Sequence, residues 1–180
     1  MGRTGFYRLR QFWNGWFAAL TPAEVSAALL YLPAAAQVRF RTLPTDAQRH
    51  SLNVLQTLQA RGPVDEPLAA AALLHDIGKL AADEAGMRIN LWVRGPLVVL
   101  EKAAPQLLKR WASPDVAHGW RYLLYVHLMH PMIGAQWAKA WGCTPLPCWL
   151  IEHHQDHLAT APATEAEQNL VLLQWADNRN

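Results

Sequence analysis

A histidine and an aspartate stand side by side where an Ala- and Leu-rich run ends, in the segment LLHDIGKL of residues 73–80. Burial of an aspartate without a partner is costly, so this position needs a cation, a hydrogen-bond donor or solvent. One interpretation is that a helix ends here and its last residues are solvated. The other is that His75 and Asp76 together hold a metal ion.

Further imidazole and carboxylate groups recur along the chain, each beside an apolar stretch of a separate expected helix. A helical bundle builds an interior metal site from facing helices in this way. Neutral imidazole and carboxylate suit Fe, Mn, Zn, Co or Ni, whereas Ca²⁺ prefers oxygen ligands alone. Any single histidine would ordinarily be a hydrogen-bonded core or surface group, so the ordered set carries the prediction. Its other members are His50, His130, the adjacent pair His153 and His154, and Asp177.

Two residues that follow Asp76 support a site for an anionic ligand. Gly78 permits a sharp turn, and Lys79 brings a cation close to the pocket in which an anionic oxygen would lie. Arg94 and Arg121 are additional candidates for a substrate phosphate, because a guanidinium can bind phosphate through two hydrogen bonds.

Capping residues predict where the helices that position these groups begin. The segments TPAE and TDAQ indicate helix starts in which Thr21 and Thr45 are N-caps, completed by Glu24 and Gln48. Asp65 is the expected cap of the helix EPLAAAALLHD, which Gly78 terminates. Pro105 opens a shorter helix, as does Pro96.

The second half of the chain is divided by prolines and glycines. Pro131 disfavours helical geometry at His130, so we expect one helix to end there and another to run to Gly142. Thr144 opens the next helix, and a capping box at residues 164–167 opens the last. No alternating apolar and polar run predicts a strand. The sequence therefore predicts an all-α helical bundle of about seven to nine helices, with an N-terminal helical segment (residues 1–44) packing on a core domain (residues 45–180).

Composition limits the classes of function. The 180 residues are 52% hydrophobic, which suffices for one domain with a full core. The net charge is only +2 and the basic residues are scattered, so binding to a nucleic acid duplex is not expected. Cys143 and Cys148 lack the spacing of a zinc ribbon and are interpreted as reduced thiols. Without a long apolar run or a signal peptide, the expected location is the cytoplasm, with no transmembrane segment.

Several segments, taken in order, resemble the HD-domain metal-dependent phosphohydrolase superfamily of the HDIG kind. They are RHSLNV, LLHDIGKL, HPMIGA, LIEHHQDH and LLQWADN, and the resemblance covers residues 45–180. It implies a helical-bundle HD core that holds divalent transition metals, two in number, with Fe or Mn favoured over Zn, Co or Ni.

The resemblance also implies roles for particular residues. One metal would be held by His50, His75, Asp76 and Asp177, and Asp76 would bridge to a second metal at His130 and His153. His154 would be a further ligand or a contact to the substrate phosphate, and Asp46 corresponds to a third-metal ligand of some members.

The activity implied is hydrolysis of a phosphomonoester or phosphodiester by a hydroxide that bridges the metals, with Asp76, Lys79 and His154 as catalytic residues. The substrate would be a small phosphorylated molecule, a nucleotide or a cyclic dinucleotide. The glycine–tyrosine–proline signature of the HD-GYP branch is missing after the paired histidines, which argues against cyclic di-GMP. A mixed-valent di-iron oxygenase and a non-catalytic module that binds nucleotides or proteins stay open as alternatives, as does the oligomeric state.

Asp177 lies three residues before the last residue of the sequence. A ligand in that position is poorly held unless its helix is well packed. We therefore expect Leu170, Leu173 and Trp175 to anchor the last helix.

Overall fold

The computed structural model describes residues 19–87 and 104–180, and within these ranges the chain forms helices and no strand. The all-α prediction is confirmed, and the α-helices of the described ranges fall within the predicted number. They are α2 (Pro22–Leu29), α3 (Ala34–Thr42), α4 (Thr45–Gln59), α5 (Glu66–Leu74), α6 (Leu80–Glu84), α8 (Pro105–Trp111), α9 (Trp120–Ala140), α10 (Pro145–His153) and α11 (Glu165–Asp177), with 3₁₀ turns η1 (Ile77–Lys79) and η2 (Val116–His118). The helix expected at Pro96 and residues 1–18 of the N-terminal segment lie outside the described residues.

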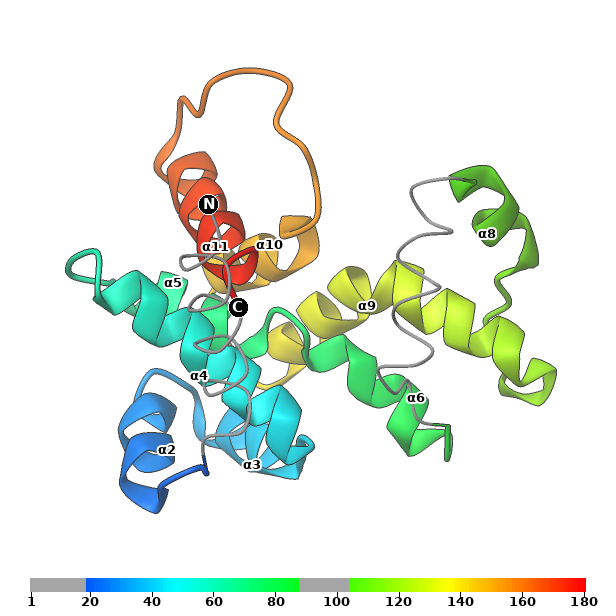
Figure 1. Ribbon diagram of the computed structural model, residues 1–180, viewed down its shortest axis with the longest axis horizontal. Helices are drawn as coiled ribbons and strands as arrows, with labels where there is room; N and C mark the ends of the chain where they lie inside the picture. The colour runs from blue at the N-terminus through cyan, green and yellow to red at the C-terminus, as the bar shows by residue number, and fades with distance from the viewer. Residues whose placement is uncertain (1–18, 88–103) are drawn as a thin grey trace, which may run out of the picture.

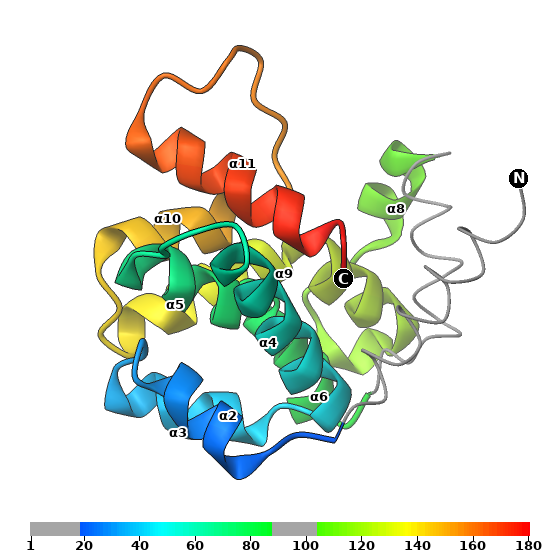
Figure 2. The same cartoon turned by 60° about the vertical axis from the view of Figure 1, so that its left-hand side comes forward.

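The main core lies between α4, α5, α10 and α11, with α9 packed along α10 (Figures 1 and 2). From Leu68 to Leu74, helix α5 is buried all round, because it consists there of Ala and Leu alone and α4, α10 and α11 can approach its backbone closely. Helices α2 and α3 add Leu29 and Phe40 to the same core that contains Leu73 and Leu170. The described part of the segment before Thr45 therefore shares one hydrophobic core with the rest of the bundle.

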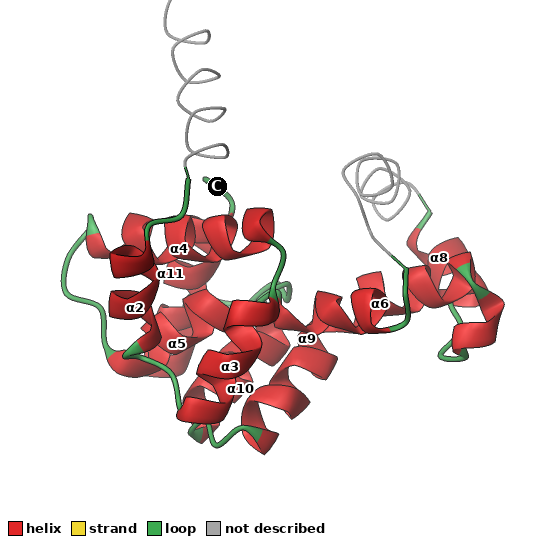
Figure 3. Ribbon diagram, turned by 90° about the horizontal axis from the view of Figure 1, so that it is seen from below, coloured by secondary structure: helices red, strands yellow, loops and turns green. Residues whose placement is uncertain are grey.

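The first half of α9 projects beyond this core, and α6 and α8 lie beside it there (Figures 1 and 3). A second, small apolar cluster of Ala81, Ala82 and Val126 joins α6 to α9. Within residues 19–87 and 104–180, no helix has both the length and the hydrophobicity that crossing a membrane requires.

Three of the predicted helix caps are confirmed. The hydroxyl of Thr21 accepts from the backbone N–H of Glu24 at 3.2 Å, and the carboxylate of Asp65 accepts from Leu68 at 3.0 Å. Thr164 forms a complete capping box with Glu167.

The predicted cap at Thr45 is wrong, because α4 already includes this residue and its N-cap position is taken by Pro44. The side-chain amide of Gln48 donates instead to the carbonyl oxygen of Leu43 at 2.9 Å, which closes the preceding turn. Likewise, the Glu24 carboxylate binds Arg49 of α4, at 2.7 Å and 2.9 Å, so this carboxylate links two helices.

The predicted helix break at His130 is also wrong, because α9 runs without interruption through Pro131. A proline inside a helix removes one backbone donor to the carbonyl four residues earlier, here that of His127. That carbonyl oxygen accepts from the ring Nδ1 of His130 at 2.7 Å, which replaces the missing donor. Gly142 does close the helix as predicted, with φ of +90° and with Cys143 N–H bonded to the Ala138 carbonyl at 3.0 Å.

Gly78 has a different role from the one expected, since it lies in the turn η1 and is not among the glycines with positive φ. A Cβ at this position would lie 2.8 Å from the backbone nitrogen of Gly134 and closer still to the carbonyl oxygen of His130. Glycine is needed because η1 packs directly against the backbone of α9. This close approach brings Asp76 next to the histidines of the neighbouring helices.

Candidate metal centre

The structure gathers six of the candidate side chains into two adjacent groups at the centre of the bundle. The first group consists of His50 from α4, His75 from the end of α5 and Asp177 from the end of α11. Within it, His50 Nε2 lies 3.1 Å from Asp177 Oδ1 and 3.2 Å from His75 Nε2, and His75 Nε2 lies 3.5 Å from the same carboxylate oxygen. Three helices that are distant in sequence thus direct one ligand atom each to a common point.

The second group consists of Asp76, His130 from the middle of α9 and His154 from the end of α10. Asp76 Oδ1 lies 3.3 Å from His130 Nε2 and 3.8 Å from His154 Nε2. The rings of His130 and His154 meet edge to face, with centroids 5.2 Å apart. Both imidazoles are almost fully buried.

Asp76 lies between the groups and turns one carboxylate oxygen to each. Oδ1 faces His130 and His154, while Oδ2 lies 3.8 Å from His75 Nε2 and 3.9 Å from His50 Nε2. A carboxylate in this position can bind one cation with each oxygen. The bridging role that the resemblance implied for Asp76 therefore agrees with where its two oxygens point.

Each of the three buried histidines of the two groups has its ring oriented by a carbonyl oxygen of its own helix, three residues earlier. His75 Nδ1 lies 3.0 Å from Ala72 O, and His130 and His154 repeat this contact at 2.7 Å with His127 and Ile151. A carbonyl oxygen only accepts, so Nδ1 carries the proton in all three rings. In the neutral ring, the Nε2 lone pair then points to the group, as in histidines that ligate metals.

The spacing of the donor atoms matches what one ion would require. Donors held about 2.1 Å from an ion lie about 3.0–3.4 Å apart at angles between a right angle and the tetrahedral value. The donor atoms of the first group are separated by 3.1, 3.2 and 3.5 Å. Two Nε2 atoms at 3.2 Å repel each other unless a proton or a cation lies between them, so the residues fit a metal ion.

The electrostatics of the carboxylates favour their ionised, ligand-competent form. Burial opposes ionisation of Asp76, but the ammonium of Lys79 and the rings of His75 and His130 hold its pKa well below its usual range. The pKa of Asp177 is lowered too, because His75 and His50 outweigh the effect of burial. Both carboxylates are therefore negatively charged at neutral pH.

The pKa values of the buried histidines in the two groups shift in different directions, according to the charges around each ring. Burial, together with the neighbouring rings of His75 and His130, lowers the pKa of His154 to about 3, so the ring is neutral at physiological pH. Burial also lowers the pKa of His130. Burial acts in the same direction on His75, but Asp76 and Asp177 outweigh it and raise its pKa.

The structure corrects the assignment of His153 as a ligand, because His154 and not His153 belongs to the second group. His153 turns away from both groups: its Nδ1 lies 2.6 Å from Asp156 Oδ2, and its ring stacks near Trp149. Consecutive residues of a helix point about 100° apart, so only one of the pair can face the core. His154 follows the buried face of Pro147, Leu150 and Ile151, at the spacing that would have identified it from the sequence.

Of the roles expected for His154, a further ligand or a contact to the substrate phosphate, its geometry fits the ligand. Its Nδ1 proton is bonded to the Ile151 carbonyl, and a ring with a pKa of about 3 holds no second proton at neutral pH. His154 therefore acts through its Nε2 lone pair.

Lys79 lies where the sequence predicted a cation, with its ammonium 2.5 Å from Asp76 Oδ2. Its side chain is 25% exposed, whereas that of Asp76 is 15% exposed. The ammonium thus lies at the boundary between the site and solvent.

Two other candidates are not brought into either group. Asp46 is exposed in the first turn of α4, which suits an acidic residue at a helix N-terminus and explains its position without a metal. Arg121 donates from Nε to the Trp111 carbonyl at 2.8 Å, and it begins α9 nine residues before His130, about 14 Å along the axis. It joins α8 to α9 and does not serve the site. Arg94 lies outside the described residues.

Helix α11, which carries Asp177 at its end, is anchored to the bundle by the side chains that we expected. Leu170 and Leu173 are fully buried, and the guanidinium groups of Arg61 and Arg179 lie 4.8 Å and 4.5 Å from the Trp175 ring centroid. The side-chain amide of Asn180 donates to Thr57 Oγ1 of α4 at 2.9 Å. Asp177 is therefore held against the helix that carries His50.

Comparison of the chain with protein-family models, with curated proteins and with solved structures gives no match. The assignment to the HD superfamily therefore stays a prediction, and the function has to be argued from the site.

Proposed function

We propose that this protein is a metal-dependent phosphohydrolase of the HD kind, with two divalent transition metals, Fe or Mn, held by His50, His75 and Asp177 and by Asp76, His130 and His154. The observation that carries the proposal is the position of Asp76, whose two oxygens face two groups of imidazoles. Two ions so placed would act as Lewis acids, which favours hydrolysis of a phosphoester over reactions that need a single ion.

The orientation of the imidazoles supports the same proposal. Rings fixed by Ala72, His127 and Ile151 carbonyls present their Nε2 atoms before any ion binds. Preorganised ligands of this kind hold a charged site without rearrangement during the reaction. A binding module has no need for six converging ligand atoms in a buried pocket.

Lys79 would stabilise the phosphate. Its ammonium lies beside Asp76 and is partly exposed, so it can approach a phosphoryl oxygen while remaining close to the carboxylate. A cation there stabilises the negative charge that develops on the phosphoryl oxygens. Lys79 contacts a ligand carboxylate but is not among the candidate ligands. We therefore expect Lys79→Met to lower kcat while most of the bound metal is kept.

The test is metal content by elemental analysis of the full chain, expressed without a histidine tag and purified without chelator, alongside hydrolysis of p-nitrophenyl phosphate. About two equivalents of Fe or Mn, with hydrolysis, are expected for the natural sequence. Asp76→Ala should lose hydrolysis and both ions. Asp115→Ala, at an exposed aspartate that precedes η2 and belongs to neither group, should keep hydrolysis and both ions.

Two outcomes would contradict the proposal. Failure to bind metal, even after reconstitution, would exclude a metallohydrolase. Binding of two irons with oxygen consumption, but without phosphoester hydrolysis under any metal, would instead favour the di-iron oxygenase that the sequence left open.

A further inference from the structure

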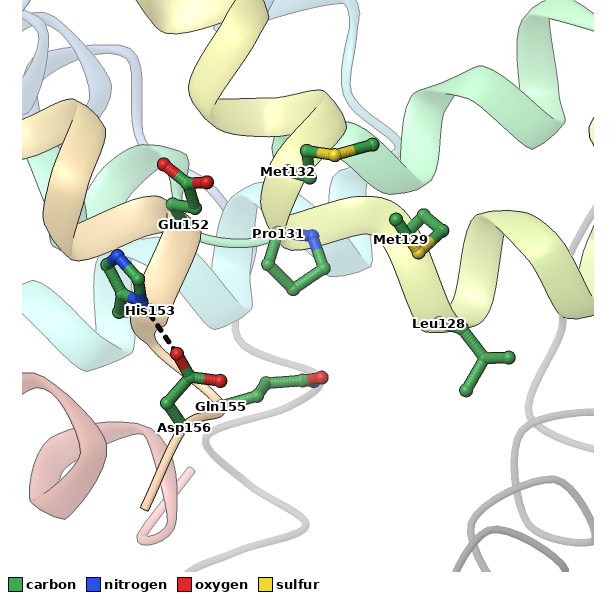
Figure 4. A pocket seen from close by; sticks show the side chains of 8 residues that line it. All are labelled: Leu128, Met129, Pro131, Met132, Glu152, His153, Gln155 and Asp156. Carbon is green, nitrogen blue, oxygen red and sulfur yellow. Dashed lines mark hydrogen bonds and ion pairs between the residues drawn. The ribbon is translucent and has the colours of Figure 1, made fainter. Parts of the chain in front are cut away.

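A groove of about 270 Å³ opens beside the second group, between the middle of α9 and the end of α10 (Figure 4). One wall is apolar and formed by Leu128, Met129, Pro131 and Met132 of α9. The opposite wall is polar and formed by Glu152, His153, Gln155 and Asp156.

The groove is joined to the candidate metal centre by Gln155. Its side chain lines the groove, and its amide Nε2 lies 3.3 Å from Nε2 of His130. Because His130 donates through Nδ1 to His127, its Nε2 lone pair accepts from the amide. An ion at His130 would take this lone pair and leave the amide beside the second group. A molecule with a phosphate at the second group would therefore place the rest of its structure in this groove.

The charge of the groove is opposite to that of a phosphate. Glu152 and Asp156 contribute two carboxylates, and none of the eight lining residues is a lysine or an arginine. Asp156 bonds to His153 at 2.6 Å, and Glu152 belongs to the same wall of the groove (Figure 4). Carboxylates repel an additional phosphate and accept hydrogen bonds from hydroxyl or amino groups.

The size of the groove also favours a small substrate with a single phosphate. Sites for drug-sized ligands occupy about 300–1,000 Å³, so 270 Å³ suits one small organic group. The two methionines present flexible apolar walls that adapt to such a group. Two linked nucleotides, with a second phosphodiester, fit neither the volume nor the charge.

We infer that this groove binds the organic part of a phosphomonoester, a small group that carries hydroxyl or amino donors and no second phosphate. The inference rests on the proposed function, since it assumes that the phosphate lies at the metals. It narrows the substrate class from nucleotides and cyclic dinucleotides to monophosphates.

The experiment compares adenosine 5′-monophosphate with adenosine 5′-triphosphate, which share an organic group and differ only in phosphates, on the metal-reconstituted full chain. We expect kcat/KM for the monophosphate to exceed that for the triphosphate at least tenfold. Glu152→Lys should reduce this ratio at least fivefold with metal content unchanged. The matched control is Glu165→Lys, the same charge reversal on an exposed residue of α11 away from the groove, which should leave the ratio as it was.

A second variant tests the shape of the groove. Met132→Trp should fill it and lower kcat/KM for the monophosphate at least tenfold, while the metal content shows that the centre is intact. A KM increase without loss of metal would support the assignment.

The outcomes separate the two proposals. Hydrolysis of p-nitrophenyl phosphate that Asp76→Ala abolishes, combined with a preference for the triphosphate or an equal effect of both charge reversals, would overturn the groove assignment alone. Absence of hydrolysis of all three phosphoesters by the metal-loaded protein would overturn the proposed function and the groove assignment together.

Discussion

Pro131 stands four residues after His127 in one continuous helix, and the carbonyl oxygen of His127 accepts from the ring of His130. Proline supplies no backbone N–H, so it leaves room at this carbonyl for the imidazole donor. The same residue that makes the helix unfavourable thus fixes the orientation of a candidate ligand.

Replacement of this proline should change stability and metal affinity in opposite directions. Pro131→Ala restores a backbone donor to His127, so we expect the free energy of unfolding of the metal-free protein to rise by about 1 kcal/mol or more. The His130 ring must then share the His127 carbonyl with this new donor, so the affinity of the second group for a metal ion should fall about tenfold. Chemical denaturation measures the free energy of unfolding, and metal titration measures the affinity. A fall in stability together with unchanged affinity would show that the proline has no such role.

The paired histidines provide a direct test of which ring faces the site. His154→Ala should lose about one equivalent of metal, since His154 Nε2 belongs to the second group. His153→Ala should keep both equivalents, because His153 bonds to Asp156 instead. Elemental analysis of the two variants is the measurement. The reverse pattern would restore the assignment made from the sequence.

Gly78→Ala should destabilise the protein by about 3 kcal/mol, because the new methyl group would overlap the His130 carbonyl and η1 cannot move without displacing Asp76. Gly62→Ala is the matched control: nothing lies within 4 Å of a Cβ there, and we expect a change within about 1 kcal/mol. Urea denaturation compares the two. Equal changes would refute close packing at η1.

The ion pair between α2 and α4 should make stability depend on pH. Hydrogen bonding to the buried Arg49 guanidinium lowers the pKa of Glu24, despite the opposing effect of burial. A lowered folded-state pKa means that the carboxylate stabilises the fold above its unfolded pKa, and that this contribution disappears as the pH falls through the folded value.

We therefore expect Glu24→Gln to cost about 2 kcal/mol at pH 7 and much less at pH 3, measured by denaturation at both values. The control is Glu84→Gln, whose partner Arg39 and whose own side chain are about half exposed (48% and 51%), with an expected change below about 0.5 kcal/mol. A cost for Glu24→Gln that is the same at both pH values would contradict the linkage.

The two cysteines should react slowly with alkylating reagents in the native protein. Both are free thiols, and burial raises the pKa of Cys143 to about 11. At pH 8 its thiolate fraction is then about a hundredfold below that of an unperturbed cysteine. Alkylation followed by mass spectrometry should show rapid labelling of Cys143 only after unfolding. Rapid labelling of the native protein would indicate that the α9–α10 turn opens.

The fold class and most of the candidate site could be predicted because both depend on local signals. Thr21, Asp65 and Thr164 start their helices through side chains only three residues away from the groups they cap. The predictions for His50, His75, Asp76 and Asp177 required only that three helices share one interior.

The predictions that failed depended on packing between elements. Nothing in the sequence near Pro131 indicates that α10 and η1 hold the helix on both sides, so a local rule predicted a break. The role of Gly78 likewise depends on the distance between η1 and α9. His154 is different: the apolar face of Pro147, Leu150 and Ile151 identifies it, and attention to helical spacing would have chosen it over His153.

The carbonyl contacts of His75, His130 and His154 have a consequence for protein engineering. Each ring is oriented by a carbonyl of its own helical turn, so a short segment carries the orientation with it: four residues at a helix end for His75 and His154, and five within a helix for His130, which needs Pro131. A designer who grafts such segments onto an idealised bundle would have to reproduce only the placement of the helix axes, and not a surrounding network of polar side chains.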